Sequence, residues 1–184
     1  KPFSLKVPAL VVTRGKSGRI NIMLSSWFTP MGAEPSSFIM ALKKTSKTFE
    51  LLEETGEFVI AAPCEAMLEV LVYAGGVSGH AEDKWQMSGL TAAQPSKIGV
   101  PLIAEALANV ELRVARKIVF DENYFLIVGE VPDGVAAHDV LGGQGCRRPL
   151  QRRDQLDGLG HLGIVLLGFA GDRDGVFYVG DAPR

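Results

Sequence analysis

The 184-residue chain has few cysteines, few histidines and no long apolar run. Its two cysteines, Cys64 and Cys146, are far apart and in no metal-binding or redox spacing, so we expect Cys64, after an apolar stretch, to be a buried thiol rather than half of a disulfide. The longest apolar run, residues 163–171, is interrupted by glycine and is too short to span a bilayer. No signal-peptide pattern opens the sequence. These absences predict a cytoplasmic protein.

The chain also has no large excess of charge of either sign. Nineteen basic residues face 21 acidic ones, giving a formal net charge of −2, so nothing argues for a nucleic acid or an acidic membrane as partner. An anionic ligand would have to be bound by local groups. A hydrophobic content of 47% suits one globular domain over residues 1–184.

Short alternating segments dominate what is present. They predict strands over 9–13, 20–26, 37–42, 57–62, 109–120 and 124–131, and helices over 47–55 and 65–73. The last two strands form a predicted hairpin, with Glu111, Arg113 and Arg116 on its wetter side. Many strands with few helices predict a mainly β protein, a closed or partly closed antiparallel barrel, rather than a doubly wound sheet.

Several catalytic and binding motifs are weak or absent. The pattern GxGxxG occurs at 158–163, but without the preceding strand and following helix that dinucleotide binding requires, so a glycine-rich turn is the better interpretation. His80, His138 and His161 show no metal-ligand spacing. Ser78-Gly79-His80 lacks a nucleophile elbow. The sequence therefore predicts neither a metal site nor a nucleophile.

Two segments could together bind a ligand that has an aromatic ring and a phosphate. If Ile20, Ile22 and Leu24 face the barrel interior, Asn21, Met23 and Ser25 share the other face, and Ser26 and Trp27 follow. Lys43, Thr45, Ser46 and Thr48 stand where a helix begins, a natural place for an anion. Other roles stay open: Ser46 or Thr45 as an N-cap, Trp27 in the core, Asn21 in a turn.

The order of these motifs resembles the flavin reductase-like proteins, including the flavoredoxins. The resemblance covers roughly residues 8–131 and rests on the following segments: GRINIM at 18–23, SW at 26–27, EP at 34–35, TFEL at 48–51, ETGEFV at 54–59, VSG at 77–79, DKW at 83–85, PLIAE at 101–105 and VGEV at 128–131. It implies an FMN-binding split β-barrel of Greek-key type, with FMN bound noncovalently near the interface of a homodimer.

The resemblance also implies roles for particular residues. Asn21, Ile22 and Met23 would approach the isoalloxazine edge, and Ser25, Ser26 and Trp27 would continue that wall. The phosphate or ribityl chain would be held by Thr48, Ser46, Thr45 and Lys43, and Lys84 would reach the flavin or its phosphate. The histidine that members often carry before the GEV signature is replaced here by Tyr124 or Asn123.

The implied function is electron transfer through bound FMN, from NADH, NADPH or a protein donor to an acceptor, in the manner of an NAD(P)H:flavin oxidoreductase. Alternatives stay open. Reduced flavin could be released to a partner monooxygenase, or the barrel could bind or sense FMN without turnover, or it could bind no ligand. The arginines of residues 147–153 could recognise a nicotinamide phosphate or form a solvated loop.

Overall fold

The computed structural model of the chain describes residues 7–135. The glycine pattern at 158–163, the arginines of 147–153, Cys146 and two of the three histidines, His138 and His161, lie outside the described residues. Cys64 is buried, as expected, and forms no disulfide among the described residues. In the described part of the chain, no helix has the length and apolar character needed to cross a membrane.

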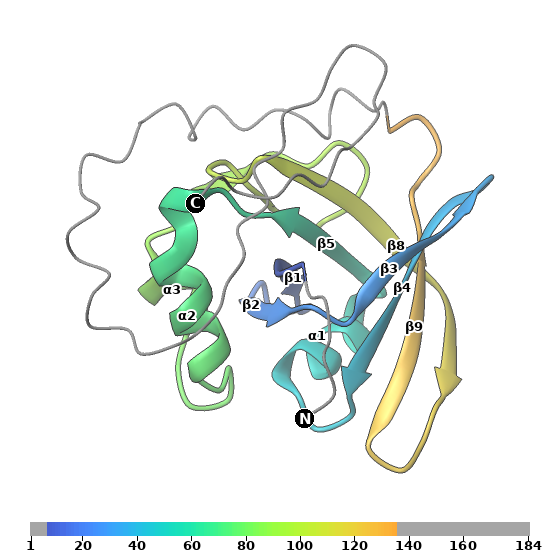
Figure 1. The fold of residues 1–184 in the computed structure, drawn as a ribbon, viewed down its shortest axis with the longest axis horizontal. Coiled ribbons are helices and arrows are strands. Elements are labelled where there is room, and N and C mark those ends of the chain that lie inside the picture. The colour runs from blue at the N-terminus through green and yellow to red at the C-terminus, as the bar shows by residue number, and fades with distance from the viewer. Residues whose placement is uncertain (1–6, 136–184) are drawn as a thin grey trace, which may run out of the picture. The chain divides into compact units, whose positions relative to one another are not determined.

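Seven strands form one antiparallel sheet (Figure 1). Their order across the sheet is β2-β1-β5-β8-β9-β4-β3, and a second, small sheet pairs β6 with β7. The bounds are β1 Ala9–Arg14, β2 Ile20–Ser25, β3 Phe28–Ala33, β4 Ser36–Lys43, β5 Glu57–Ala62, β6 Ala92–Ala93, β7 Leu102–Ile103, β8 Ala108–Val119 and β9 Tyr124–Glu130. The predicted strands therefore all exist, whereas β3, β6 and β7 were not predicted.

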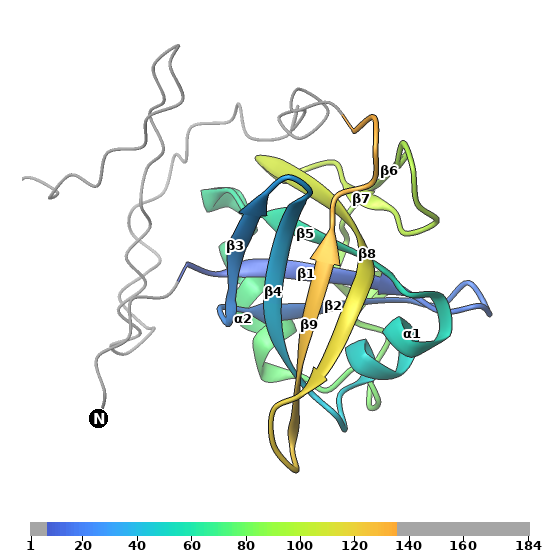
Figure 2. The same cartoon turned by 90° about the vertical axis from the view of Figure 1, so that its right-hand side faces the viewer.

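The sheet curls until its two edges meet. β2 and β3 are the opposite edge strands, yet only Ser26 and Trp27 separate them in sequence. Three Cα-to-Cα steps reach at most roughly 10 Å, so the edges must be close, and the curl is visible in Figure 2, where β1 and β2 pass behind β3, β4, β9 and β8. Ser26 and Trp27 thus mark the seam of a barrel.

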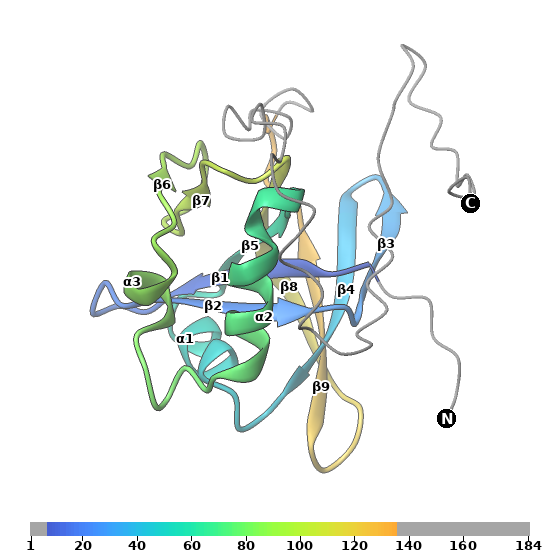
Figure 3. The same ribbon diagram turned by 60° about the vertical axis from the view of Figure 1, so that its left-hand side comes forward.

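Helices cover one side of this barrel and one of its ends. α1 spans Lys47–Thr55, as the sequence predicts; Ser46 caps its start and Gly56, with φ of 68°, ends it. The predicted helix at 65–73 is a 3-10 turn, η1 Glu65–Met67, followed by α2 Leu68–Gly76. α3 Lys84–Ser88 was not predicted. Figure 3 shows α2 and α3 on the β1–β2 side of the sheet.

Two apolar layers result, and they correct one expectation. Val11, Phe58 and Met40 belong to a core inside the curled sheet. Ile22 belongs to a second core, which β1, β2 and β5 share with α2. The face of β2 that carries Ile20, Ile22 and Leu24 is therefore the helix-covered face, and Met23 faces the barrel interior. Period-two alternation gave the correct grouping, but the apolar character of both faces hid which one is inside.

Glu111 is a second correction. Its side chain is buried rather than on the wetter side of the hairpin. The carboxylate accepts hydrogen bonds from the Ser96 N–H and hydroxyl and from the N–H groups of Lys97 and Ile98, at 2.7 to 3.1 Å. Arg113 and Arg116 are exposed, as predicted. Glu111 thus ties the segment 96–98 to β8.

Candidate functional site

A buried amide and a buried hydroxyl join the two segments that the sequence singles out. Asn21 in β2 is 3% exposed and Thr48 in α1 is 1% exposed. The Asn21 Nδ2 atom donates a hydrogen bond to Thr48 Oγ1 at 3.0 Å. Asn21 therefore lies in a strand, not in a turn, and fixes the first turn of α1 against β2.

The start of α1 carries both its cap and free donors. Ser46 Oγ accepts from the Phe49 N–H at 3.1 Å and donates to the Lys43 carbonyl at 2.8 Å. The N-cap role is therefore real. The N–H groups of Lys47 and Thr48, the first two of the helix, have no intrahelical acceptor. They point out of the helix end, where the dipole is positive, so a bound anion would meet backbone donors there.

Residues 78–83 lie against this helix start. From this region the sequence analysis assigned only the neighbouring Lys84 to the site. A Cβ on Gly79 would overlap the Asn21 Oδ1 atom and come within 3.0 Å of Lys47 Cβ. Arg19 Nη2 donates to the Gly79 carbonyl at 2.8 Å. His80 Nε2 lies 3.3 Å from the Thr45 carbonyl oxygen. The VSG motif was a usable signal for Gly79, whereas nothing in the sequence links Arg19 to it.

The seam places two aromatic rings on the outer face of the barrel. Trp27 is 51% exposed, and its ring centroid lies 5.5 Å from that of Tyr124, with the planes tilted by 48°. Trp27 is therefore not part of the core. Its N–H donates to Ser25 Oγ at 3.4 Å. Lys43, exposed, is paired with Tyr124 in the β4–β9 register, so a cation stands beside the two rings.

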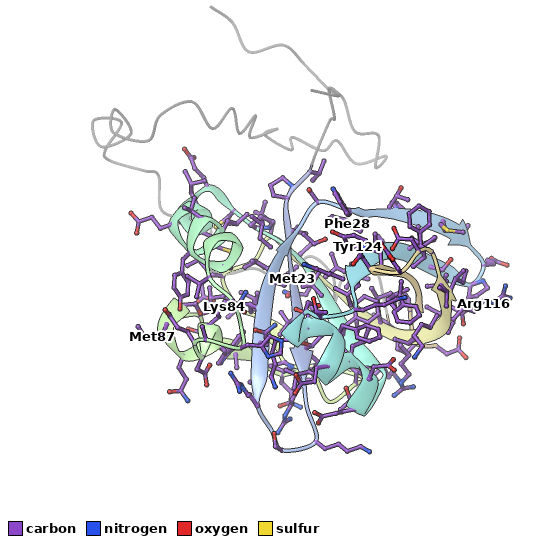
Figure 4. All side chains as sticks on the ribbon, turned by 90° about the horizontal axis from the view of Figure 1, so that it is seen from below. Met23, Phe28, Lys84, Met87, Arg116 and Tyr124 are labelled. Atoms are coloured by element: carbon purple, nitrogen blue, oxygen red, sulfur yellow. The ribbon has the colours of Figure 1, made fainter. Side chains whose placement is uncertain are left out.

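β2 is an edge strand, which matters for its own backbone. Within the described residues only β1 pairs with it, so half of its backbone N–H and C=O groups are not used in the ladder. Ile22 is fully buried, Ser25 nearly so, while Met23 and Ser26 are half-buried. In the view of Figure 4, Met23 lies between Lys84 on one side and Phe28 and Tyr124 on the other.

Lys84 is buried and its contact is with the protein. The ammonium Nζ donates to the Ala74 carbonyl of α2 at 2.9 Å, and the side chain is 4% exposed. Burial lowers the pKa of Lys84. The structure thus does not bring Lys84 into hydrogen-bond contact with Asn21, Ser46 or Thr48.

The arrangement suits a ligand that is anionic at one end and flat and aromatic at the other. Helix N–H donors would suit the anion, and a strand edge with a half-exposed indole would suit the ring. Those are the parts a flavin mononucleotide presents, so the residues present fit that group. No assembled nucleophile and base are needed for such a site, because a flavin supplies its own chemistry.

Comparisons with known proteins agree with this description. The Escherichia coli uncharacterized protein YddH is 33% identical over 132 residues, 70% of each chain. An uncharacterized protein of Archaeoglobus fulgidus is 34% identical over 111 residues, 60% of this chain. The matched part of the chain spans only 62% of that archaeal relative.

Solved structures share the fold. The FMN-binding protein of Thermus thermophilus, with bound 1-cyclohex-2-enone, is 26% identical with a TM-score of 0.64, over 73% of this chain and 70% of that one. Flavoredoxin of Desulfovibrio vulgaris is 28% identical with a TM-score of 0.62, over 77% and 82% of the two chains. A Shewanella frigidimarina protein described as having a split barrel domain is 19% identical with a TM-score of 0.63, over 74% and 72%, and bears on the fold alone.

These likenesses confirm the expected split-barrel fold. The family model named flavin reductase like domain matches residues 4–150, most of the chain. The chain belongs to the flavin reductase-like domain family.

Proposed function

We propose that this protein binds FMN noncovalently and passes electrons through it, from NADH, NADPH or a protein donor to an acceptor. The observation that carries the proposal is the start of α1, where Asn21 donates a hydrogen bond to Thr48 and the first two N–H groups of the helix have no acceptor within the helix. These groups, beside an edge strand, support an anion site at this place. The Thermus protein that shares the fold is FMN-binding by its own description, which supports the same ligand here.

The phosphate would lie at the first turn of α1. The N–H groups of Lys47 and Thr48 would donate to it, since Ser46 already satisfies the Phe49 N–H. The Ser46 hydroxyl donates to the Lys43 carbonyl and would have to leave that bond to reach a phosphate. Thr45 and Lys43 are exposed on the segment that enters the helix. They would add a hydroxyl and a positive charge at the rim.

The ring would lie along the outer edge of β2 from Asn21 to Met23, towards the seam. Backbone groups on the unpaired edge of β2 would contact it at Ile22 without exposing the buried Ile22 side chain. Ser25, Ser26 and Trp27 would border its far end. Bound FMN supplies two-electron redox chemistry, while the residues of this chain orient it and limit access to it.

Lys84 would act by charge rather than by direct coordination. Its amine is buried and its pKa is lowered because the charged form is poorly solvated there. Negative charge brought close to Met23 would favour the protonated amine. Lys84 would thus stabilise the more negative, reduced state of a bound flavin.

A second copy of the chain is the partner we propose. β4 and β9 are apolar on both faces: Met40, Leu42 and Ile127 fill the inner core, so Ile39 and Val128 point outwards from half-buried positions. Strands that are apolar on both faces are usually covered on both. Lys43 stands near one end of this outer face and Glu130 near the other, so a two-fold axis would bring opposite charges together.

The test is the visible absorption spectrum of the purified protein after incubation with FMN and removal of free flavin. A flavin spectrum that bleaches with NADH or NADPH in the absence of air supports the full proposal and identifies the donor. If the bound flavin bleaches only with a chemical reductant and no added acceptor reoxidises it, the protein binds FMN without turnover, and the redox role is contradicted. A protein that retains no FMN at micromolar concentration would contradict the proposal entirely.

A further inference from the structure

His80 connects two parts of the site that are far apart in sequence. Its Nε2 atom lies 3.3 Å from the Thr45 carbonyl oxygen, and its Nδ1 atom lies 3.7 Å from Glu50 Oε2. Thr45 immediately precedes the helix cap, and Glu50 is in the first turn of α1. One half-exposed ring thus contacts both sides of the helix start.

Both neighbours of this ring are hydrogen-bond acceptors. A neutral imidazole has one N–H, so it can donate to the Thr45 carbonyl or to the Glu50 carboxylate but not to both. A protonated imidazole has two N–H groups and a positive charge, which suits both neighbours. Protonation of His80 would therefore strengthen the link between residues 78–83 and α1.

The other charged groups near the His80 ring have partners of their own. Glu50 forms an ion pair with Lys47 at 2.5 Å. The Lys47 hydrogen bond, with the nearby positive charges of His80 and Arg19, holds the pKa of Glu50 below its ordinary value. On His80's own segment, Glu82 accepts from the Tyr73 hydroxyl at 2.8 Å. Asp83 caps α3 by accepting from the Gln86 N–H. Neither acidic group contacts the imidazole.

Gly79 connects the His80 segment to the proposed phosphate site at the start of α1. Gly79 is packed so closely on the Asn21 side-chain oxygen that no Cβ fits between them. The Asn21 amide in turn holds the Thr48 hydroxyl. A shift of residues 78–83 would therefore be felt at the first turn of α1, where the free N–H donors lie.

We propose that His80 is a positioning residue whose protonation fixes residues 78–83 against the start of α1 and tightens the hold on a phosphate there. The inference rests on the proposed function for the identity of the ligand, since the phosphate is that of FMN. It assigns to this family member a pH-dependent element outside the ring-binding wall.

The experiment compares the wild-type protein with His80→Gln from pH 5.5 to 8.5, measuring the dissociation constant of FMN by flavin fluorescence. The ratio of the two constants removes the titration of the phosphate itself, which is the same for both proteins. We expect the variant to bind about two- to fivefold more weakly, relative to wild type, at pH 5.5 than at pH 8.5. Riboflavin, without a phosphate, should show a smaller change. A ratio independent of pH would overturn the proposal.

A second measurement needs no flavin. The Ala81 and Glu82 N–H groups both donate to the Ser78 carbonyl, at 3.0 and 3.2 Å, so their hydrogen-exchange protection reports the order of this segment. His80→Gln should lower that protection more at pH 5.5 than at pH 8.5. If neither protein takes up FMN yet protection changes in this way, the proposed function fails and the His80 link stands; unchanged protection would overturn the link.

His80→Arg is the matched rescue variant. Arginine keeps several N–H donors and a charge that does not titrate in this range. It should restore FMN affinity at acidic pH and hold it as pH rises. An arginine variant as weak as the glutamine variant at pH 5.5 would contradict a role for the charge.

Discussion

Single residues set the closest contacts in this barrel, and Gly129 in β9 shows how. A Cβ built on Gly129 would lie 2.5 Å from Phe58 Cζ and 2.8 Å from Cε1. Phe58 is fully buried in the inner core, so its ring has no open space to move into. The glycine is needed for space rather than for an unusual backbone angle.

Gly129→Ala should therefore destabilise the fold by about 1–3 kcal/mol, the usual cost of overpacking a core. Chemical denaturation measures it. The double variant Gly129→Ala with Phe58→Leu should recover part of the loss relative to Phe58→Leu alone, because the smaller side chain makes room. Additive losses would mean that the two side chains do not compete for this space.

Lys84 is a buried lysine whose proposed role is electrostatic. Lys84→Met keeps the aliphatic stem and removes the amine, so the fold should persist, with the Ala74 carbonyl losing its donor. The reduction potential of bound FMN should fall, because a positive charge that favours the reduced flavin is gone. Potentiometric titration is the measurement, with the exposed Lys97 of the segment 96–98 changed to Met as the control. An unchanged potential would remove Lys84 from the site.

At the scale of elements, α1 contributes to the inner core and also carries the proposed anion site. Its Leu52 enters the inner core, while its first turn carries the Ser46 cap. Cap and anion site share a few atoms, so a substitution that only weakens the cap would confuse the two. Variants that keep the cap can separate them.

Ser46→Asp and Ser46→Asn make this separation, because both side chains cap helices about as well as serine. Both variants should keep the stability of the wild type to within about 1 kcal/mol. Only the aspartate adds a negative charge at the helix start. It should weaken FMN binding about tenfold or more relative to the asparagine variant, and riboflavin binding much less. Equal losses for both ligands would place the phosphate elsewhere.

Glu111 holds the segment 96–98 through four hydrogen bonds. Burial opposes its ionisation, but the bonds from Ser96, Lys97 and Ile98 outweigh burial and lower the pKa of Glu111. Because the folded pKa is the lower one, the bonds contribute stability above the ordinary glutamate pKa, and that contribution is lost as pH falls through the lowered value.

Glu111→Gln should thus cost about 1–3 kcal/mol at pH 7, since an amide cannot accept all four bonds and brings its own donors against N–H groups. The cost should shrink as pH falls from the ordinary glutamate pKa through the lowered pKa of Glu111, because the wild-type carboxylate then becomes protonated. Urea denaturation of both proteins at pH 7 and pH 3.5 gives the comparison. A pH-independent difference would show that the charge of Glu111 is not what holds the segment.

At the scale of the whole molecule, the outer face of β4 and β9 is the proposed interface between two copies of the chain. Light scattering should give about twice the chain mass for the wild type. Val128→Lys, on the outer face, should give the mass of one chain, because an unpaired charge in an apolar interface costs several kcal/mol. Val72→Lys on α2, where valine is already 44% exposed, is the control and should leave the mass unchanged. A monomeric wild type that retains FMN would contradict the proposed self-association.

Much of the fold could be predicted from the sequence because its signals are local. The α1 helix has a capping serine and a terminal glycine with nine helical residues between them, and its predicted bounds are those observed. The β8–β9 hairpin was also found, since both strands and their turn are contiguous. β3 was missed because Pro30, the bulge after it and its exposed side chains break the strand pattern.

The sequence by itself determined that Asn21, Met23 and Ser25 share a face, where α1 begins, and which family the motifs resemble, since alternation, capping and motif order are properties of neighbouring residues. Only the tertiary structure decided that Met23 faces the barrel interior, that Glu111 is buried, and that Arg19, Gly79 and His80 meet the start of α1. Those facts depend on long-range packing, which brings together residues such as Arg19 and Gly79, 60 positions apart in the sequence. Long-range packing of that kind leaves no periodic signal in the chain.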